Sequence, residues 1–119
     1  GEIGETAQDA VPTLFLMIED DIDRYAARAA VNKIGPRDVT LLIGKMTNES
    51  PFVRLTACEA LNSLGTRAAE ALNFLKGRLA DKALLKQAEM GGDYGIRRCI
   101  NETVKKLEKA QDSSNEYRP

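Results

Sequence analysis

Small and apolar residues recur at helical spacing in three segments of the chain, which align when Arg24, Arg54 and Arg97 are superposed. The third, sixth, seventh and tenth positions after each arginine form the stripe, with Thr103 as a polar exception: Ala27, Ala30, Val31, Ile34; Ala57, Ala60, Leu61, Leu64; Ile100, Thr103, Val104, Leu107. This spacing places the stripe on one face of a helix. The pattern predicts three amphipathic helices that repeat one unit.

The same start and stop signals accompany these helices. Asp20, Ser50 and Asp93 stand four residues before the arginines, and all three residue types favour a helix N-cap. Gly35 and Gly65 follow the first two helices and favour the left-handed conformation at a helix C-terminus. We therefore expect each helix to begin at its cap and the first two to end at a glycine.

Three further helices are predicted between these, over residues 7–19, 37–47 and 67–79. Their apolar positions are Val11, Leu14, Phe15, Ile18; Val39, Leu42, Ile43, Met46; and Leu72, Leu75, Leu79. The chain thus alternates a first helix, a turn and a second helix. We call the first helix of each pair helix A and the second helix B.

The phrase Ala10-Val11-Pro12-Thr13-Leu14, the step from Asp20 to Arg24 and a spacing of about thirty residues resemble HEAT-like repeats of the phycobilisome-lyase type. The resemblance implies an all-α fold, a right-handed α-solenoid of about three HEAT-like helical hairpins. It also implies that the repeated arginines contact an acid of a neighbouring repeat. The expected organisation is a repeat domain over 1–110, with repeats at about 4–35, 36–65 and 66–110, and a disordered tail over 111–119.

Two departures from a regular array stand out. The third repeat carries an insertion around residues 82–92. Residues 2–4 align with the end of a helix B, so we expect the chain to be the C-terminal fragment of a longer protein. Helix A of the first repeat would then expose Val11, Leu14, Phe15 and Ile18, and we expect self-association through this N-terminal helix.

Composition removes most catalytic chemistry. The chain has 119 residues, a net charge of -1 and no histidine, so a Ser–His or Cys–His pair is excluded. Cys58 and Cys99 are too few for a disulfide framework and are interpreted as small packing residues. The acids at residues 20–23 lack the spacing of a calcium loop and are interpreted as helix-capping residues. No catalytic, metal or cofactor site is predicted.

In HEAT-like proteins the B helices line the concave surface, and helical spacing then selects the outward positions. The candidate binding residues are Tyr25, Asn32, Lys33, Leu55, Glu59, Asn62, Arg98, Glu102 and Lys105. Ala29, Ser63 and Lys106 share this face. The face mixes both charges with aromatic and apolar groups, which suits a protein or peptide partner. The predicted function is a noncatalytic protein–protein interaction scaffold.

Two alternatives stay open. Residues 55–107 are similar to the C-terminal HEAT-like extensions of some bacterial sulfatases, which implies an accessory domain of a hydrolase; the Cys-x-Pro-Ser-Arg motif of those enzymes is missing. HEAT-like alkylpurine DNA glycosylases grip DNA, and the last helix gathers basic residues: Arg97, Arg98, Lys105, Lys106 and Lys109. However, Glu102 and Glu108 interrupt this basic run, and the sequence pI is near 5.5, which disfavours a nucleic-acid partner.

Overall fold

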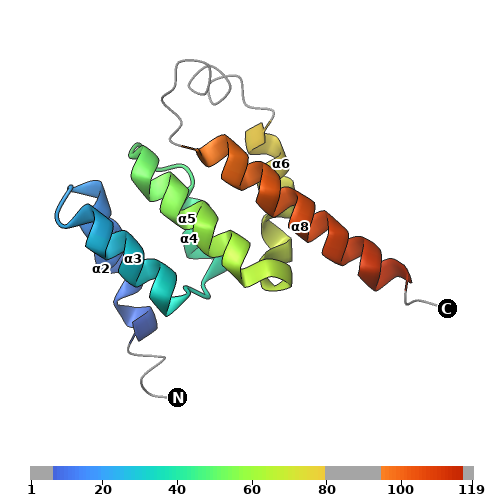
Figure 1. The fold of residues 1–119 in the computed structure, drawn as a ribbon, viewed down its shortest axis with the longest axis horizontal. Coiled ribbons are helices and arrows are strands. Elements are labelled where there is room, and N and C mark those ends of the chain that lie inside the picture. The colour runs from blue at the N-terminus through green and yellow to red at the C-terminus, as the bar shows by residue number, and fades with distance from the viewer. Residues whose placement is uncertain (1–6, 80–94, 117–119) are drawn as a thin grey trace.

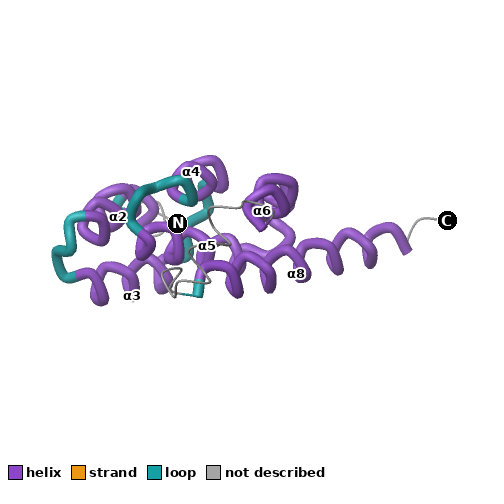
Figure 2. The backbone as a smooth tube through the Cα atoms, turned by 90° about the horizontal axis from the view of Figure 1, so that it is seen from above, coloured by secondary structure: helices purple, strands orange, loops and turns teal. Residues whose placement is uncertain are grey.

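The computed structural model describes residues 7–79 and 95–116, and all regular structure within these ranges is helical. The elements are α2 (Val11–Glu19), α3 (Arg24–Ile34), α4 (Val39–Lys45), α5 (Pro51–Leu64), the 3₁₀ segment η1 (Gly65–Ala71), α6 (Leu72–Leu79) and α8 (Ile96–Glu116) (Figure 1). The A helices α2, α4 and α6 form one layer and the B helices α3, α5 and α8 form the other (Figure 2). This stack of helix pairs confirms the predicted all-α solenoid.

The N-cap prediction is confirmed for α5. The Ser50 side chain accepts a hydrogen bond from the Val53 amide at 3.4 Å, and Pro51 occupies the first helical position, where its missing N–H costs nothing. In the same way, the Asp38 carboxylate accepts from the Leu41 amide at 3.1 Å and starts α4. Both helices of the middle repeat therefore begin at a side chain that caps an amide three residues later in the chain.

The prediction that Asp20 caps the first helix B is wrong. Asp20 ends α2, and α3 begins only at Arg24. The intervening loop reverses direction through two left-handed residues, Asp21 with φ 59° and Asp23 with φ 46°. Aspartate tolerates this conformation better than most residues, so the acidic cluster makes the turn rather than the cap. Asp93 lies outside the described residues.

Both glycines have positive φ, but only Gly35 adopts the predicted left-handed helical conformation. Gly35 is left-handed with φ 68°, and its amide donates to the Val31 carbonyl at 3.0 Å. Gly65 has φ 59° but ψ -127°, and the chain enters η1 directly. The helix predicted over 67–79 is therefore a 3₁₀ segment followed by α6. The small side chains of Ala68 and Ala71 are fully buried, which lets this tight turn press against the core.

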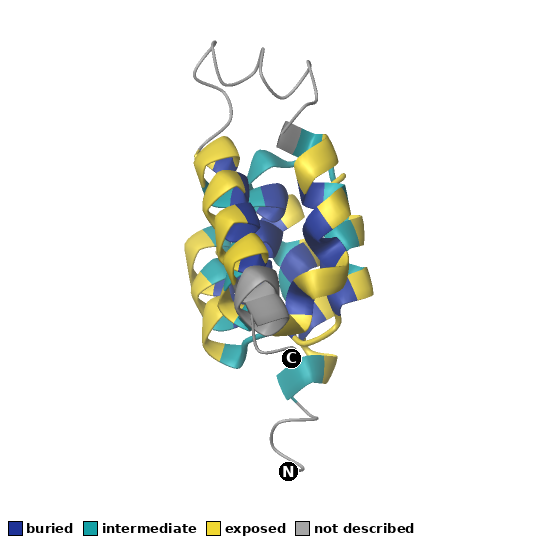
Figure 3. Cartoon of the chain, turned by 90° about the vertical axis from the view of Figure 1, so that its right-hand side faces the viewer, coloured by how far each residue is buried: buried dark blue, intermediate teal, exposed yellow. Residues whose placement is uncertain are grey.

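The apolar stripes meet between the two layers (Figure 3). Leu61, at the centre of the α5 stripe, is completely buried. Thr103, the polar exception, is also buried, and its hydroxyl donates to the Cys99 carbonyl oxygen at 2.8 Å. A buried hydroxyl with a partner avoids most of the desolvation cost, so Thr103 does not break the stripe.

The apolar face expected to be exposed on the first helix A is covered. Val11, Phe15 and Ile18 are at most 1% exposed, because α2 packs against both α3 and α5. Among the described residues, the exposed large hydrophobic side chains are instead Leu16 at 53%, Ile22 at 54% and Tyr25 at 74%. Residues 14–18 are all apolar and surround the helix, so one of them must face outward whichever side is buried.

The C-terminal helix is longer than predicted. A disordered tail was predicted from residue 111, whereas α8 continues to Glu116. Glu, Lys, Ala and Gln at residues 108–111 are good helix formers, and neither glycine nor proline interrupts the chain before Pro119. The predicted insertion at 82–92 and the alignment at residues 2–4 lie outside the described residues.

Candidate partner-binding groove

The three B helices lie side by side (Figures 1 and 2). Their side chains line a hollow of about 510 Å³. We call it the B-helix groove. Six of the predicted binding residues line it: Asn32, Leu55, Glu59, Asn62, Arg98 and Glu102. They come from three different helices, so the repeat register brings side chains far apart in sequence around one hollow.

The other three predicted residues lie beside the groove. Tyr25, Lys33 and Lys105 are exposed on the same B helices but do not line the hollow. Tyr25, at 74% exposure, precedes Arg28 by three residues and Asn32 by seven, which is one face of a helix. Tyr25 therefore extends the groove surface along α3.

Ser63, which was predicted to share this face, also lines the hollow, and sequence analysis missed three lining residues: Arg28, Gly95 and Cys99. Arg28 occupies the position that Cys58 and Asn101 occupy in the other repeats. Because Cys58 was interpreted as a packing residue, Arg28 was not selected as a binding residue. A signal was nevertheless present, because Arg28 and Glu59 carry opposite charges at adjacent register positions of neighbouring B helices. Pairing such charges between repeats would have placed Arg28 at the groove.

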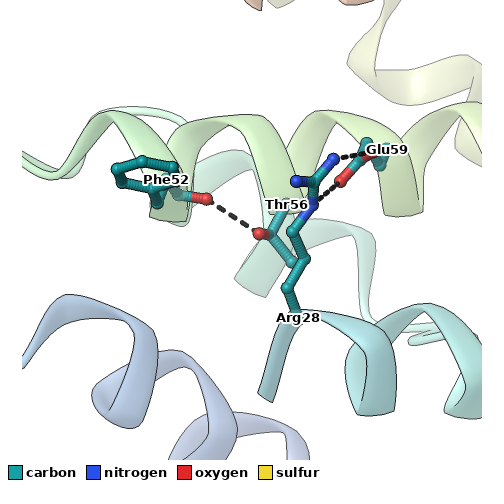
Figure 4. Close-up of polar contacts among 4 residues, drawn as sticks. All are labelled: Arg28, Phe52, Thr56 and Glu59. Carbon is teal, nitrogen blue, oxygen red and sulfur yellow. Dashed lines mark hydrogen bonds and ion pairs between the residues drawn. The ribbon is translucent and has the colours of Figure 1, made fainter. Parts of the chain in front are cut away.

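Arg28 and Glu59 form a forked ion pair between α3 and α5 (Figure 4). Arg28 Nε donates to Glu59 Oε1 at 2.8 Å and Arg28 Nη2 to Oε2 at 2.7 Å. The hydrogen bond to Glu59 raises the pKa of Arg28. Both side chains are about one third exposed, at 31% and 28%, so the pair sits at the edge of the solvent-filled groove.

Beside this pair, Thr56 is buried on α5, and its hydroxyl donates to the Phe52 carbonyl oxygen at 2.8 Å (Figure 4). The Arg24 guanidinium lies 4.0 Å from the centre of the Phe52 ring, a cation–π contact between α3 and α5. These contacts fix the α3 side of α5 and so fix where Glu59 stands.

A hydrogen-bond network without an ion pair joins α5 to α8 on the other side of the groove. Asn62 Nδ2 donates to Thr103 Oγ1 at 3.0 Å, and Lys106 Nζ donates to the Asn62 carbonyl oxygen at 2.8 Å. Cys58 Sγ lies 3.8 Å from the same Thr103 hydroxyl. Thr103 therefore connects the two helices beneath the groove.

Arg98 and Glu102 pair within α8, with Nε to Oε1 at 3.1 Å. Their side chains are 86% and 58% exposed, so water competes for both charges and the pair contributes little to stability. A bound partner can therefore replace this contact at small cost. Arg98 and Glu102 are the charged lining residues that are most available to a ligand.

The expectation that the repeated arginines contact an acid of a neighbouring repeat is wrong. Arg24 pairs with Asp21 of its own turn at 2.7 Å. Arg54 is buried and donates through Nη1 to the carbonyl oxygens of Asn48 and Glu49, at 2.7 and 3.1 Å; burial lowers its pKa. Arg97 is exposed. In the middle repeat the arginine instead stabilises the turn before its own helix, because the carbonyl oxygens of that turn accept its hydrogen bonds.

The groove suits polar recognition. Two arginines and two glutamates line it, so its lining has no net charge. Within residues 7–79 and 95–116, no cluster of three or more Cys, Asp or Glu side chains could hold a metal ion. No helix in these ranges is long and apolar enough to cross a membrane. Leu55 supplies the groove's main apolar contact, surrounded by hydrogen-bonding groups.

A family model for HEAT repeats matches residues 11–90, more than half of the chain. No curated protein and no solved structure matches it. The match spans the first two helix pairs and α6, which are the elements whose two-layer packing builds the α3 and α5 walls of the groove. The chain therefore belongs to the HEAT-repeat family.

Proposed function

We propose that this chain is a noncatalytic scaffold that binds a protein or peptide in the B-helix groove. HEAT repeats commonly serve as protein-interaction scaffolds, and their all-α fold is typically noncatalytic. The observation that carries the proposal is the groove itself: six outward residues selected by helical spacing surround one hollow of about 510 Å³.

The partner's chemistry follows from rows of equivalent positions across the B helices. The first row holds Tyr25, Leu55 and Arg98, so it offers an aromatic ring, an aliphatic side chain and a guanidinium in succession. Such a row favours a peptide with an apolar side chain near an acidic one, since tyrosine and arginine are frequent interface anchors. Asn32 and Asn62 lie further toward the C-terminal ends of α3 and α5. Their side-chain amides can form hydrogen bonds with the main chain of a bound peptide.

The balanced lining argues against a nucleic-acid partner. A phosphate backbone draws affinity from uninterrupted positive charge, whereas Arg28 is neutralised by Glu59 and Arg98 faces Glu102. The salt dependence of the binding affinity distinguishes a nucleic-acid partner from a peptide partner. Binding to a phosphate backbone through six or more contacts weakens by about a thousandfold or more between about 50 and 200 mM salt, whereas peptide binding in a neutral groove changes little.

The test selects ligands from a displayed library of random peptides and measures their affinity by calorimetry. Leu55→Glu and Arg98→Glu place unfavourable groups in the groove and should each weaken binding by about tenfold or more. Thr40→Glu and Asn73→Glu are the matched controls, because both residues are exposed on A helices in the opposite layer. The controls should change affinity by less than about twofold.

Circular dichroism on each variant separates a lost contact from a lost fold. Leu55 is half-buried, so Leu55→Ala is included as a milder substitution. Selected peptides that bind the groove variants and the wild type equally well would refute the proposed site. An accessory role in a hydrolase such as a bacterial sulfatase would use the same groove, with a segment of the enzyme domain as the peptide.

Self-association is a separate proposal, and it concerns exposed apolar residues of the first repeat. Leu16, Ile22 and Tyr25 are the exposed large apolar groups of the first repeat. We expect weak dimerisation through one or more of these exposed groups, which Leu16→Glu should weaken. Sedimentation over a range of concentrations checks this expectation; a monomer at every concentration would contradict it.

A further inference from the structure

Helices α5 and α8 run side by side in the same direction (Figure 1). The Asn62 to Thr103 hydrogen bond of 3.0 Å fixes their register. Cys58 precedes Asn62 by four residues on α5, and Cys99 precedes Thr103 by four residues on α8. Four residues are about one helical turn, so the same register places Cys58 beside Cys99.

The contacts of the two cysteines agree with this register. Cys58 Sγ lies 3.8 Å from Thr103 Oγ1, and Thr103 Oγ1 donates to the Cys99 carbonyl oxygen at 2.8 Å. A hydrogen bond between the two thiols raises the pKa of Cys58 and lowers the pKa of Cys99. Both cysteines are free in the structure.

The two thiols differ in access. Cys58 is completely buried, whereas Cys99 is partly exposed and lines the B-helix groove. A small reagent that enters the groove meets Cys99 first. Cys58 can then react only with a sulfur already at position 99.

We propose that Cys58 and Cys99 form a redox pair that closes to a disulfide between α5 and α8, with a small-molecule disulfide as the oxidant. The Cys99 thiolate attacks one sulfur of the oxidant, breaks its S–S bond and releases one thiolate. The Cys58 thiol then loses its proton and attacks Cys99 Sγ, which breaks the mixed disulfide and releases the second thiolate. In sum, two protein thiols are oxidised, and one small disulfide is reduced to two thiols.

The order of the two steps follows from the environments. The lowered pKa of Cys99 favours the nucleophilic thiolate at the accessible position. The neighbouring Cys99 thiol and then burial raise the pKa of Cys58, and the first of these two contributions disappears once Cys99 carries the mixed disulfide. Closure therefore follows the first step and joins the buried α5 thiol to the sulfur that lines the groove.

The test incubates the folded chain at low concentration in buffers with increasing ratios of glutathione disulfide to glutathione. Acid quenching, alkylation and intact mass follow, with peptide mapping under nonreducing conditions. The expected product has lost two hydrogens, joins the Cys58 and Cys99 peptides, and forms to the same extent at all protein concentrations. Because the bond restrains the unfolded chain, the Tm should rise by about 5 °C or more and return on reduction.

Two single variants resolve the order of the steps. Cys58→Ala should retain a glutathione adduct on Cys99, and Cys99→Ala should leave Cys58 unmodified in the folded chain. The wild-type reaction alone is decisive if either variant fails to fold, because both thiols should disappear together. A lasting glutathione adduct without closure, a bond between two chains, closure only in denaturant, or no reaction at any ratio would each overturn the proposal.

Discussion

Helix α5 contacts its two B-helix neighbours through different chemistry. On the α3 side, the long charged side chains of Arg28 and Glu59 bridge the helices and stay about one third exposed. On the α8 side, Cys58, Asn62 and Thr103 make neutral contacts, an exposed Lys106 adds one hydrogen bond, and α5 packs more extensively there. Small side chains allow helices to approach closely, whereas long charged ones hold water at the interface. We therefore expect the α5–α8 interface to be the more stable of the two.

The difference arises at equivalent positions of the repeat. Arg28, Cys58 and Asn101 all stand four residues after the aligned arginine. The repeat register thus specifies which residue faces a neighbour but leaves its size and charge free. One scaffold can therefore combine a tightly packed interface with a wetter one that opens into a groove.

The largest effect is expected at the centre of the buried α5 stripe. Leu61 is completely buried in α5, so Leu61→Ala should lower the free energy of unfolding by about 2–5 kcal/mol. Urea unfolding followed by circular dichroism measures it. Leu16→Ala, at an exposed apolar position, is the control and should cost much less. A loss below about 0.5 kcal/mol for Leu61→Ala would mean that α5 does not hold the stack together.

Much of the fold is readable from local signals. Ser50 caps α5 and Gly35 ends α3 as predicted, because each acts on backbone groups a few residues away. Asp20 failed as a cap because the identical residue type also makes left-handed turns, and Asp21 and Asp23 adopt them. The local pattern does not distinguish the two uses of aspartate.

Contacts between repeats were harder to predict. The Arg28–Glu59 pair spans 31 residues, close to the repeat spacing, whereas the Asn62–Thr103 bond spans 41. The third repeat contains additional residues, so the repeat spacing alone does not predict which residues of α5 and α8 lie side by side. For this reason the groove position of Arg28 was within reach of sequence analysis, but the Cys58–Cys99 proximity required the structure.

A second prediction probes the α8 side. Thr103→Val preserves the shape of the side chain but leaves the Asn62 amide without its acceptor. The free energy of unfolding should fall by about 1–3 kcal/mol. Thr40→Val, at an exposed position of α4, is the matched control. If both substitutions have the same negligible effect, the hydrogen bond between Asn62 and Thr103 does not stabilise this interface.

A smaller effect is expected on the α3 side. A double-mutant cycle with Arg28→Met and Glu59→Gln should give a coupling energy of about 1 kcal/mol or less, because water screens the partly exposed pair. The coupling should shrink as salt is added. Coupling well above the cost of Thr103→Val would reverse the ranking of the two interfaces.

The smallest effect belongs to the Arg98–Glu102 pair. Both side chains are largely exposed, so Glu102→Gln should change the free energy of unfolding by less than about 0.5 kcal/mol. Thermal unfolding checks this expectation. The same substitution should change peptide affinity, because it alters the charge of the groove lining. A large loss of stability would indicate a structural pair rather than one available to a partner.

Amide chemical-shift mapping by NMR shows whether the B-helix groove receives the partner. The chain is titrated with a peptide selected from the random library. The account predicts that the largest shifts fall on α3, α5 and α8, around Asn32, Glu59 and Glu102, with little change on α2 and α4. Shifts confined to α2 and α4, with the B helices unperturbed at saturation, would contradict it.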